Sequence, residues 1–271
     1  MADSLDSDLI LARLRPQVRA RMASLAVLRR VDSTNAELLR RPVPEGGLAA
    51  VLAADCQDAG RGRRGRDWAS PQGGNLYLSL SRGFSGGPAR LEGLSLVAGI
   101  AAAEALHALG YQEVRLKWPN DLVVASPAGL RKLGGLLVEG AGTGDGQSRA
   151  VLGLGVNSRV DAGAAGRIDQ PWCDLAALSG QPPPASELAA AVLDHWVPAL
   201  DLFDRDGLAP FLPRFRALDV LEGAQVTVQL EGNAMHGVAR GLAGGGALRV
   251  RLEDGTERAF HAGEVSVRRA G

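Results

Sequence analysis

The stretch LAAVLAADCQDAGRGRRGRDW, residues 48–68, passes from an apolar run into a loop with four arginines and three glycines between positions 60 and 66. A short, uninterrupted apolar run is typical of a buried strand, so we expect a strand that leads directly into a basic loop. The spacing GRGRRG matches a phosphate-binding glycine motif, but neither a following helix nor a Lys-Ser/Thr ending supports one. Three interpretations remain open: a clamp for an anionic small molecule, a nucleic-acid arm, or a solvated surface loop.

The composition limits these interpretations. The 271 residues are 46% hydrophobic, enough for a substantial core, and thirty basic residues balance thirty acidic ones. A dedicated DNA-binding domain usually carries excess positive charge, so the neutral balance predicts no specific DNA partner. The acidic N-terminus lacks a secretory pattern, the apolar segment 93–110 is interrupted by Glu104 and His107, and the two cysteines form no metal motif. We therefore expect a cytoplasmic protein without a membrane span.

Lysine is rare in this chain. Only Lys117 and Lys132 occur among the thirty basic residues, and all the others are arginine. A lysine carries a compact, titratable ammonium that a planar guanidinium does not replace. Both lysines stand in polar, turn-rich segments, KWPND (117–121) and RKLGG (131–135). Together with the arginine loop and Asp121, they suit chemistry on a nucleotide phosphate with Mg²⁺.

The hydrophobic patterns predict a mixed sheet with helices. A helical lead-in over residues 1–24, broken at Pro16, comes first, and Thr34 with Glu37 forms a capping box for a short helix. A second helix is expected at 93–110, and a long helical stretch after the prolines 182–184. The expected strands are 25–31, 48–55, 75–81, 113–118, 122–125, 131–140 and 150–157, the last two joined as a hairpin.

The pattern changes after Leu218. Short alternating strands separated by Glu-Gly, Gly-Gly-Gly and Asp-Gly turns follow, which is typical of a small barrel built from hairpins. We therefore predict an α+β protein with two domains, a mixed-sheet domain over residues 1–217 and a small β-barrel over residues 218–271.

Six segments together resemble the biotin protein ligases, also called biotin–[acetyl-CoA-carboxylase] ligases. They are DSTN (32–35), QDAGRGRRGRDW (57–68), GGNLYLSL (73–80), KWPNDL (117–122), RKLGGLLVE (131–139) and GLGVN (153–157), followed by the C-terminal strands. Each is modest alone, but six in register over nearly the whole chain are specific. The resemblance implies a class II synthetase-like catalytic domain of the biotin/lipoate ligase type and a Src-homology-3-like barrel. The short segment before DSTN resembles the monofunctional class, which has no N-terminal DNA-binding domain.

The resemblance implies a two-step reaction with ATP and biotin as substrates and Mg²⁺ as cofactor. The carboxylate of biotin attacks the α-phosphate of ATP to give biotinoyl-5′-adenylate and pyrophosphate, and a lysine of a biotin carboxyl carrier protein then takes the biotinoyl group. Because the first step brings two anions together, converging cations lower its barrier. The arginine loop and Lys132 are the expected cations.

The matching motifs also imply the site residues. The catalytic residues are Lys132, Arg66, Asp121 and Lys117, and Asp121 is also the candidate Mg²⁺ ligand. The residues expected to contact biotin are Ser33, Thr34, Asn35, Gln57, Arg61, Gly62, Arg63, Lys132, Gly134 and Gly135. The residues expected to contact ATP or the adenylate are Arg63, Arg66, Trp68, Lys117, Asn120, Asn157 and Trp172.

Two other functions stay open at this level. A lipoate ligase shares the catalytic fold, and a protein that only captures biotin or a nucleic acid would need no chemistry. The expected partner is the carrier protein of acetyl-CoA carboxylase or a related carboxylase, with no specific DNA and no membrane, and the sequence leaves a homodimer open.

Overall fold

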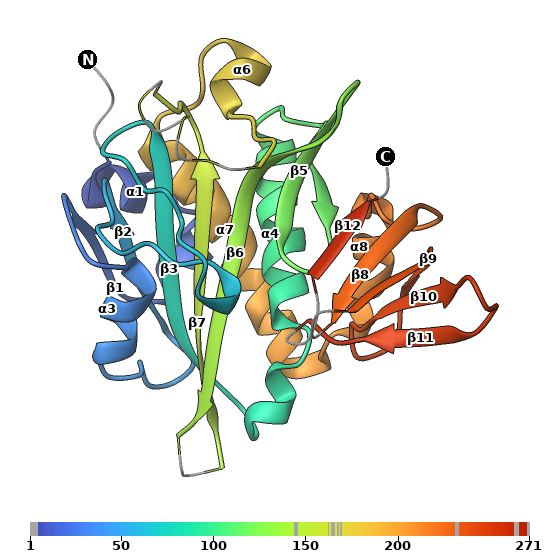
Figure 1. Ribbon diagram of the computed structural model, residues 1–271. Coiled ribbons are helices and arrows are strands. Elements are labelled where there is room, and N and C mark those ends of the chain that lie inside the picture. Colours follow the sequence, from blue (N-terminus) through green and yellow to red (C-terminus); the bar gives the residue numbers. More distant parts are fainter. Residues whose placement is uncertain are drawn as a thin grey trace.

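The computed structural model describes residues 5–143, 146–161, 163, 166, 168, 170–230, 233–262 and 266–269. Its main element is a seven-stranded sheet, and a separate five-stranded sheet lies beside it at the C-terminal end of the chain (Figure 1). Together with the helices, the two sheets confirm the predicted α+β class.

The large sheet has the strand order β1-β2-β3-β7-β6-β5-β4. Its strands are β1 (Met22–Leu28), β2 (Ala49–Ala54), β3 (Asn75–Phe84), β4 (Arg115–Lys117), β5 (Asp121–Ser126), β6 (Gly129–Gly142) and β7 (Ser148–Asn157). Strands β1 and β2 are parallel and the other neighbouring pairs are antiparallel, so the sheet is mixed. The first strand begins and ends three residues earlier than predicted, because Val31 keeps only an isolated bridge to Gln57. The strand predicted for 113–118 is shorter at both ends, and Pro119 prevents it from continuing beyond Trp118.

Helices α4 (Leu94–Ala108) and α7 (Ala185–Asp206) cover one face of the large sheet (Figure 1). Inside this layer, Trp196 Nε1 donates to Ala98 O at 2.9 Å. The other helices are α1 (Ser7–Arg13), α2 (Pro16–Arg19), α3 (Thr34–Arg40), α6 (Leu175–Ser179) and α8 (Leu212–Leu218), with 3₁₀ turns at Arg63–Gly65, Pro88–Leu91 and Ala209–Phe211. The stretch Pro88–Ala108 has the length and mean hydropathy, 1.3, of a membrane span, but 61% of its apolar window is buried inside the protein, as in a core helix.

Helix α3 begins differently from the sequence prediction. Ser33, and not Thr34, is the N-cap, and its hydroxyl accepts a backbone N–H of the first turn at 3.4 Å. The predicted capping box is wrong because the carboxylate of Glu37 pairs with two arginines at the end of the helix. Thr34 instead directs its hydroxyl into a buried polar cluster with Gln57 and Ser79.

The small sheet is antiparallel and has the strand order β11-β10-β9-β8-β12. Its strands are β8 (Gln225–Leu230), β9 (Asn233–Leu242), β10 (Leu248–Leu252), β11 (Glu257–Phe260) and β12 (Ser266–Arg269). The sequence predicts strands for this sheet at 224–230, 236–243, 247–256 and 264–269 and omits β11, because only the last of its four residues is buried and its alternation is weak. The two sheets are joined through Trp118, whose buried Nε1 donates to Gly246 O at 3.0 Å.

Asp219 is partly buried where the chain passes from α8 toward the small sheet. The next residue, Val220, donates to Leu116 O at 3.0 Å, and the Asp219 carboxylate accepts the N–H of Leu221 at 2.9 Å. Burial raises the pKa of Asp219 from 3.8 to about 6, although the hydrogen bond from Leu221 opposes the shift. The ionised carboxylate is therefore the unfavourable form in the folded protein.

We expect Asp219→Asn to stabilise the protein at neutral pH much more than at acidic pH. The unfolded chain releases this proton near pH 3.8 and the folded chain near pH 6, so the free energy of unfolding of the wild type falls between these values and then stays level. Asparagine keeps the acceptor oxygen without the charge, which should raise the melting temperature by roughly 2–8 °C at pH 7.5. Thermal melts at pH 7.5 and pH 4 check this, with Asp206→Asn at the exposed end of α7 as the control. An equal gain at both pH values contradicts it.

Candidate active site

The loop between β2 and β3 crosses one face of the large sheet (Figure 1). Leu154 and Val156 of β7 belong to the core with α4 and α7, so Gly153 and Gly155 face the opposite side. On that side the indole of Trp68 covers Gly155, and its ring atoms lie 2.6–2.8 Å from where a Cβ would stand. The candidate site therefore lies on the sheet face away from the core helices.

Lys132, Lys117 and Asp121 meet on strands β4 to β6. Asp121 Oδ1 lies 2.7 Å from Lys132 Nζ, and Asp121 Oδ2 lies 3.6 Å from Lys117 Nζ. The three side chains are only 17–20% exposed. Burial lowers the pKa of Lys117, and the Asp121 carboxylate opposes this shift. One carboxylate thus holds two ammonium groups in a partly dry site.

The indole of Trp68 packs against this cluster. Lys132 Nζ lies 5.2 Å from the ring centroid, within the range of a cation–π contact. Trp68 Nε1 is buried and has no hydrogen-bond partner among the residues that the structure describes. Because an unpaired buried donor is unfavourable, this side of the indole suits a ligand that supplies an acceptor.

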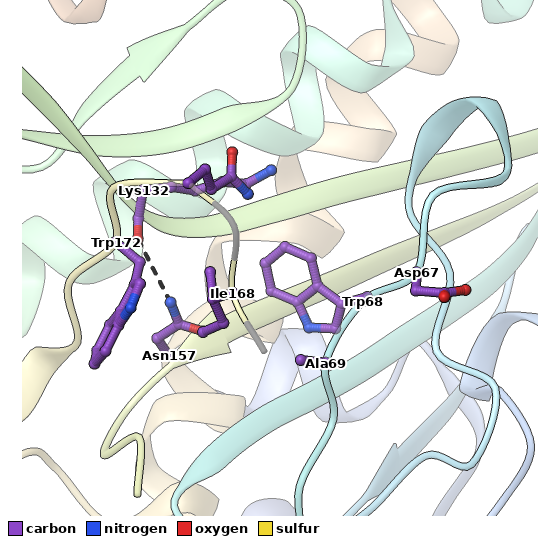
Figure 2. A pocket seen from close by; sticks show the side chains of 8 residues that line it. Asp67, Trp68, Ala69, Lys132, Asn157, Ile168 and Trp172 are labelled. Atoms are coloured by element: carbon purple, nitrogen blue, oxygen red, sulfur yellow. Dashed lines mark hydrogen bonds between the residues drawn. The ribbon is translucent and has the colours of Figure 1, made fainter. Parts of the chain in front are cut away.

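A cavity opens beside the lysine–indole contact (Figure 2). It is lined by Asp67, Trp68, Ala69, Lys132, Asn157, Ile168, Gln170 and Trp172. Lys132 N donates to Pro171 O at 2.9 Å, and Lys132 O accepts from Cys173 N at 3.0 Å, which places Trp172 beside the lysine. The amide of Asn157 holds the same segment through Cys173 O at 3.1 Å. Indoles, an amide and an ammonium suit a nucleotide, because its base stacks and its phosphate is anionic.

A second, buried polar cluster lies at the start of α3. Gln57 Oε1 accepts from Thr34 N at 2.9 Å, and Gln57 Nε2 donates to Ser70 Oγ at 3.1 Å. Ser70 Oγ donates to Trp68 O at 3.0 Å, so the cluster is connected to the basic loop. Ser33 and Thr34 are each only 4% exposed. The fold thus brings Ser33, Thr34 and Gln57 together, as their proposed common ligand requires.

Asn35 follows Thr34, but its amide points into the protein. Nδ2 donates to Leu137 O at 3.2 Å and to Glu139 Oε2 at 2.8 Å, and Oδ1 accepts from Ser79 Oγ at 2.7 Å. Both amide hydrogens are therefore engaged by strand β6. This geometry places Asn35 behind the expected ligand contacts and not among them.

The arginine loop is folded, with one arginine turned toward the lysines. Gly62 N donates to Arg66 O at 2.7 Å across the loop. Arg63 Nη1 donates to Asn120 Oδ1 at 3.2 Å, and burial lowers the pKa of Arg63. Arg61 and Arg66 are exposed, and within the described part of the chain neither side chain makes a hydrogen bond or ion pair. The structure therefore brings Arg63 and Asn120 to the site and leaves Arg61 and Arg66 at its rim.

Gly134 and Gly135 have different neighbours. A Cβ at Gly134 would lie 2.6 Å from Gly155 O, so this glycine permits close contact between β6 and β7. A Cβ at Gly135 would lie 3.2 Å from Lys132 Cε and 3.3 Å from the Trp68 ring. Of the two, Gly135 is the one that borders the lysine and the indole.

The donors around Asp121 fit a Mg²⁺ ion that arrives with a nucleotide. No group of three or more His, Cys, Asp or Glu side chains that could hold a metal ion occurs in the described ranges. Mg²⁺ is commonly held by one or two carboxylates together with substrate phosphates and water. Asp121 is therefore a candidate ligand only together with the phosphates of ATP.

Sequence reasoning missed several residues of the site. They are Asp67, Ala69, Ile168 and Gln170 in the cavity, and Ser70, Ser79 and Glu139 in the polar cluster. Position in the sequence could have indicated Asp67, Ala69 and Ser70, because they adjoin Trp68. The others are remote in sequence from the residues they contact, and only the folded sheet brings them close.

Comparison with known proteins identifies the family of the chain. The model of the Biotin/lipoate A/B protein ligase family matches residues 27–157, and the Biotin protein ligase C terminal domain matches residues 223–268. The bifunctional ligase/repressor BirA of Escherichia coli (strain K12) is 41% identical over 248 residues, which cover 91% of this chain and 75% of that protein. The biotin–[acetyl-CoA-carboxylase] ligase of Paracoccus denitrificans is 34% identical over 232 residues, which cover 83% of this chain and 93% of that protein.

Among solved structures, the biotin protein ligase from Aquifex aeolicus in complex with biotin and ATP aligns with a TM-score of 0.75 and 27% identity, over 92% of this chain and 100% of that one. The mixed sheet, with its lysine–carboxylate cluster beside an indole-lined cavity, thus has the fold of the biotin and lipoate ligases. The chain belongs to this family and, within it, to the biotin protein ligases.

Proposed function

We propose that this protein is an ATP-dependent ligase that activates biotin as biotinoyl-5′-adenylate and transfers it to a lysine of a biotin carboxyl carrier protein. The observation that carries the proposal is the position of Lys132, whose side chain borders the cavity, the Trp68 ring and Asp121 at once. The polar cluster of Thr34 and Gln57, connected to the same loop, offers donors and acceptors for the ureido ring of biotin. An anion site thus lies between a nucleotide cavity and a polar head-group site.

In the first step, a carboxylate oxygen of biotin attacks the α-phosphorus of ATP, and the phosphoanhydride bond breaks to release pyrophosphate. An unrelieved pair of anions at about 4 Å costs on the order of 4 kcal/mol at an effective dielectric near 20. Lys132 and Lys117 are both held by Asp121, so their positive charge is in place before the phosphate charge develops. Mg²⁺, when bound with ATP, neutralises further phosphate charge, and Asp121 would hold it together with the phosphates.

In the second step, the neutral amine of the carrier lysine attacks the carbonyl carbon of the adenylate, the amide bond forms, and AMP leaves. The amine loses a proton to solvent in this step. Asp121 is the carboxylate beside the reacting groups, and we assign it the orientation of the incoming amine.

The other site assignments are proposals that rest on position. The residues assigned to biotin are Ser33, Thr34, Gln57, Arg63 and Gly135, and those assigned to the adenylate are Trp68, Asn120, Asn157 and Trp172. Arg61, Gly62 and Arg66 join them when the loop closes on the intermediate. We further propose a cytoplasmic enzyme with domains 1–217 and 218–271, a carrier from acetyl-CoA carboxylase or a related carboxylase as partner, and no specific DNA or membrane partner.

Exchange of labelled pyrophosphate into ATP tests the proposed function. We expect exchange only when biotin and Mg²⁺ are both present, because the reversible first step needs biotin to attack ATP and Mg²⁺ to neutralise phosphate charge. The same assay with lipoate or octanoate separates the two branches of the family. Faster exchange with either of these acids than with biotin would make the substrate assignment wrong, and no exchange with any acid would favour a protein that only binds.

A further inference from the structure

A continuous chain of polar side chains runs beneath the candidate biotin contacts, from strand β6 to the start of α3. Glu139 Oε2 accepts from Asn35 Nδ2 at 2.8 Å, and Asn35 Oδ1 lies 2.7 Å from Ser79 Oγ. Ser79 Oγ in turn lies 2.7 Å from Thr34 Oγ1. Asn35, Ser79 and Thr34 are 3%, 0% and 4% exposed. Because these side chains are so deeply buried, they form hydrogen bonds with one another and not with solvent.

The chain crosses the sheet over a glycine. Ser79 of β3, Gly153 of β7 and Leu137 of β6 are neighbours in register. A Cβ on Gly153 would overlap the Asn35 amide. Because Gly153 has no side chain, the Asn35 amide can lie across β7 and contact both Ser79 of β3 and strand β6.

The amide of Asn35 has only one workable orientation. The carboxylate of Glu139 and the carbonyl of Leu137 both accept and cannot donate. Asn35 must therefore turn its NH₂ group toward them, which it does at 2.8 and 3.2 Å. Its oxygen is left facing Ser79, and this oxygen can only accept.

The orientation of the Asn35 amide also determines the hydrogen-bond directions of the Ser79 and Thr34 hydroxyl groups. Ser79 Oγ has one proton, and it lies 2.7 Å from both Asn35 Oδ1 and Thr34 Oγ1, so it cannot donate to both. Because Asn35 Oδ1 cannot donate, the Ser79 proton goes to Asn35. The contact between Ser79 and Thr34 is then a hydrogen bond only if Thr34 donates to Ser79.

This order leaves Thr34 with lone pairs and no proton for a ligand. Gln57 Oε1 accepts the backbone N–H of Thr34 at 2.9 Å and lies within hydrogen-bond distance, 3.1 Å, of Thr34 Oγ1 as well. The Thr34 proton therefore has two acceptors, Ser79 Oγ and Gln57 Oε1, and both belong to the protein. We propose that Glu139, Asn35 and Ser79 are positioning residues that fix the Thr34 hydroxyl as an acceptor, so that the site selects a ring N–H over a ring oxygen. The inference rests on the proposed function, because the ureido ring of biotin supplies such an N–H.

The test compares the binding of biotin with that of two analogues in which one or the other ureido N–H is replaced by a ring oxygen. Calorimetry with wild type and Ser79→Ala measures each dissociation constant. Wild type should bind at least one analogue far more weakly than biotin, because two acceptors would face each other. In Ser79→Ala, the closer of the two acceptors of the Thr34 proton is gone and only Gln57 Oε1 at 3.1 Å competes with the ring oxygen for it, so the preference for biotin over that analogue should fall roughly tenfold.

Ser81→Ala is the matched control. Ser81 lies on the same strand and the same face as Ser79, is also 0% exposed, and its hydroxyl accepts from Arg149 Nε at 3.2 Å. We expect this variant to keep the wild-type preference, because Ser81 is outside the chain that ends at Thr34.

Glu139→Gln is the second variant, in case Ser79→Ala does not fold. The Gln side chain can donate as well as accept, so the Asn35 amide loses its strongest orienting partner while the volume stays the same. The preference for biotin should fall about threefold, less than in Ser79→Ala, because Leu137 O still holds the amide.

The outcomes separate the inference from the function on which it rests. If Ser79→Ala weakens biotin and the analogues by the same factor, or changes neither, the residue is only structural and the inference is wrong. If wild type does not bind biotin at all, the proposed function itself fails. A preference that falls in Ser79→Ala and stays in Ser81→Ala supports the positioning chain.

Discussion

Lys132→Arg is expected to lower the rate of adenylate formation roughly a hundredfold, about the effect of losing one preorganised donor to a developing charge. The positive charge is kept, but the shape is not. Lys132 Nζ sits 2.7 Å from Asp121 and 5.2 Å from the centre of the Trp68 ring, above a glycine that offers no further room. A planar guanidinium is wider and spreads its charge over three nitrogens.

Single-turnover formation of the adenylate measures this effect. Lys132→Met serves as the reference for complete loss of the charge. Arg216→Lys, an Arg/Lys exchange on the exposed side of α8, is the control and should keep full activity. Near-normal turnover of Lys132→Arg would mean that any positive charge suffices at this position. The main support for the proposed first step would then be lost.

Gly155→Ala is expected to reduce adenylate formation by about thirty- to a hundredfold, with little change in melting temperature. The new methyl group would lie 2.6 Å from Cε2 and Nε1 of Trp68, so the indole has to leave its position over the sheet. The cation–π contact with Lys132 and one wall of the cavity would go with it. A displacement of about 1 Å in an active site can cost on the order of a hundredfold in rate.

Gly83→Ala provides a matched strand glycine. Gly83 lies on β3, and the nearest atom to its added Cβ is Val43 Cγ1 at 3.5 Å, an ordinary contact. This control should be active and stable. Full activity of Gly155→Ala would mean that the observed place of Trp68 is unrelated to the chemistry.

Much of the fold follows from local patterns. The alternation in residues 75–81 and the continuous apolar run in 48–55 predict β3 and β2, because alternation matches the two faces of an extended strand and a short apolar run is typical of a strand buried on both faces. The hairpin of β6 and β7 and the long helix α7 follow in the same way. The sequence does not predict strand β11 or the N-cap of α3. The alternation in β11 is weak, and the choice between Ser33 and Thr34 as N-cap depends on which hydroxyl makes contacts elsewhere in the tertiary structure.

Part of the candidate site also follows from the sequence, and part of it only from the fold. The rarity of lysine pointed to Lys117 and Lys132, and both meet at Asp121. The arginines of the loop looked equivalent in the sequence, yet the fold turns Arg63 toward Asn120 and leaves Arg66 exposed. A run of similar residues carries no information about which one faces inward, because that depends on the path of the backbone.

The sequence by itself determined the α+β class, the positions of most strands along the chain, the cationic character of the site and the family, because these follow from periodicity, composition and contiguous motifs. Only the tertiary structure decided that the Asn35 amide is bonded to strand β6, that Trp172 lies beside Lys132, and that Glu139 connects through Asn35 and Ser79 to Thr34. These contacts join residues that are far apart in the chain. The direction of each hydrogen bond depends on which neighbouring group can donate and which can only accept. These neighbours lie on different strands and on a helix, so no single segment of the sequence contains the information.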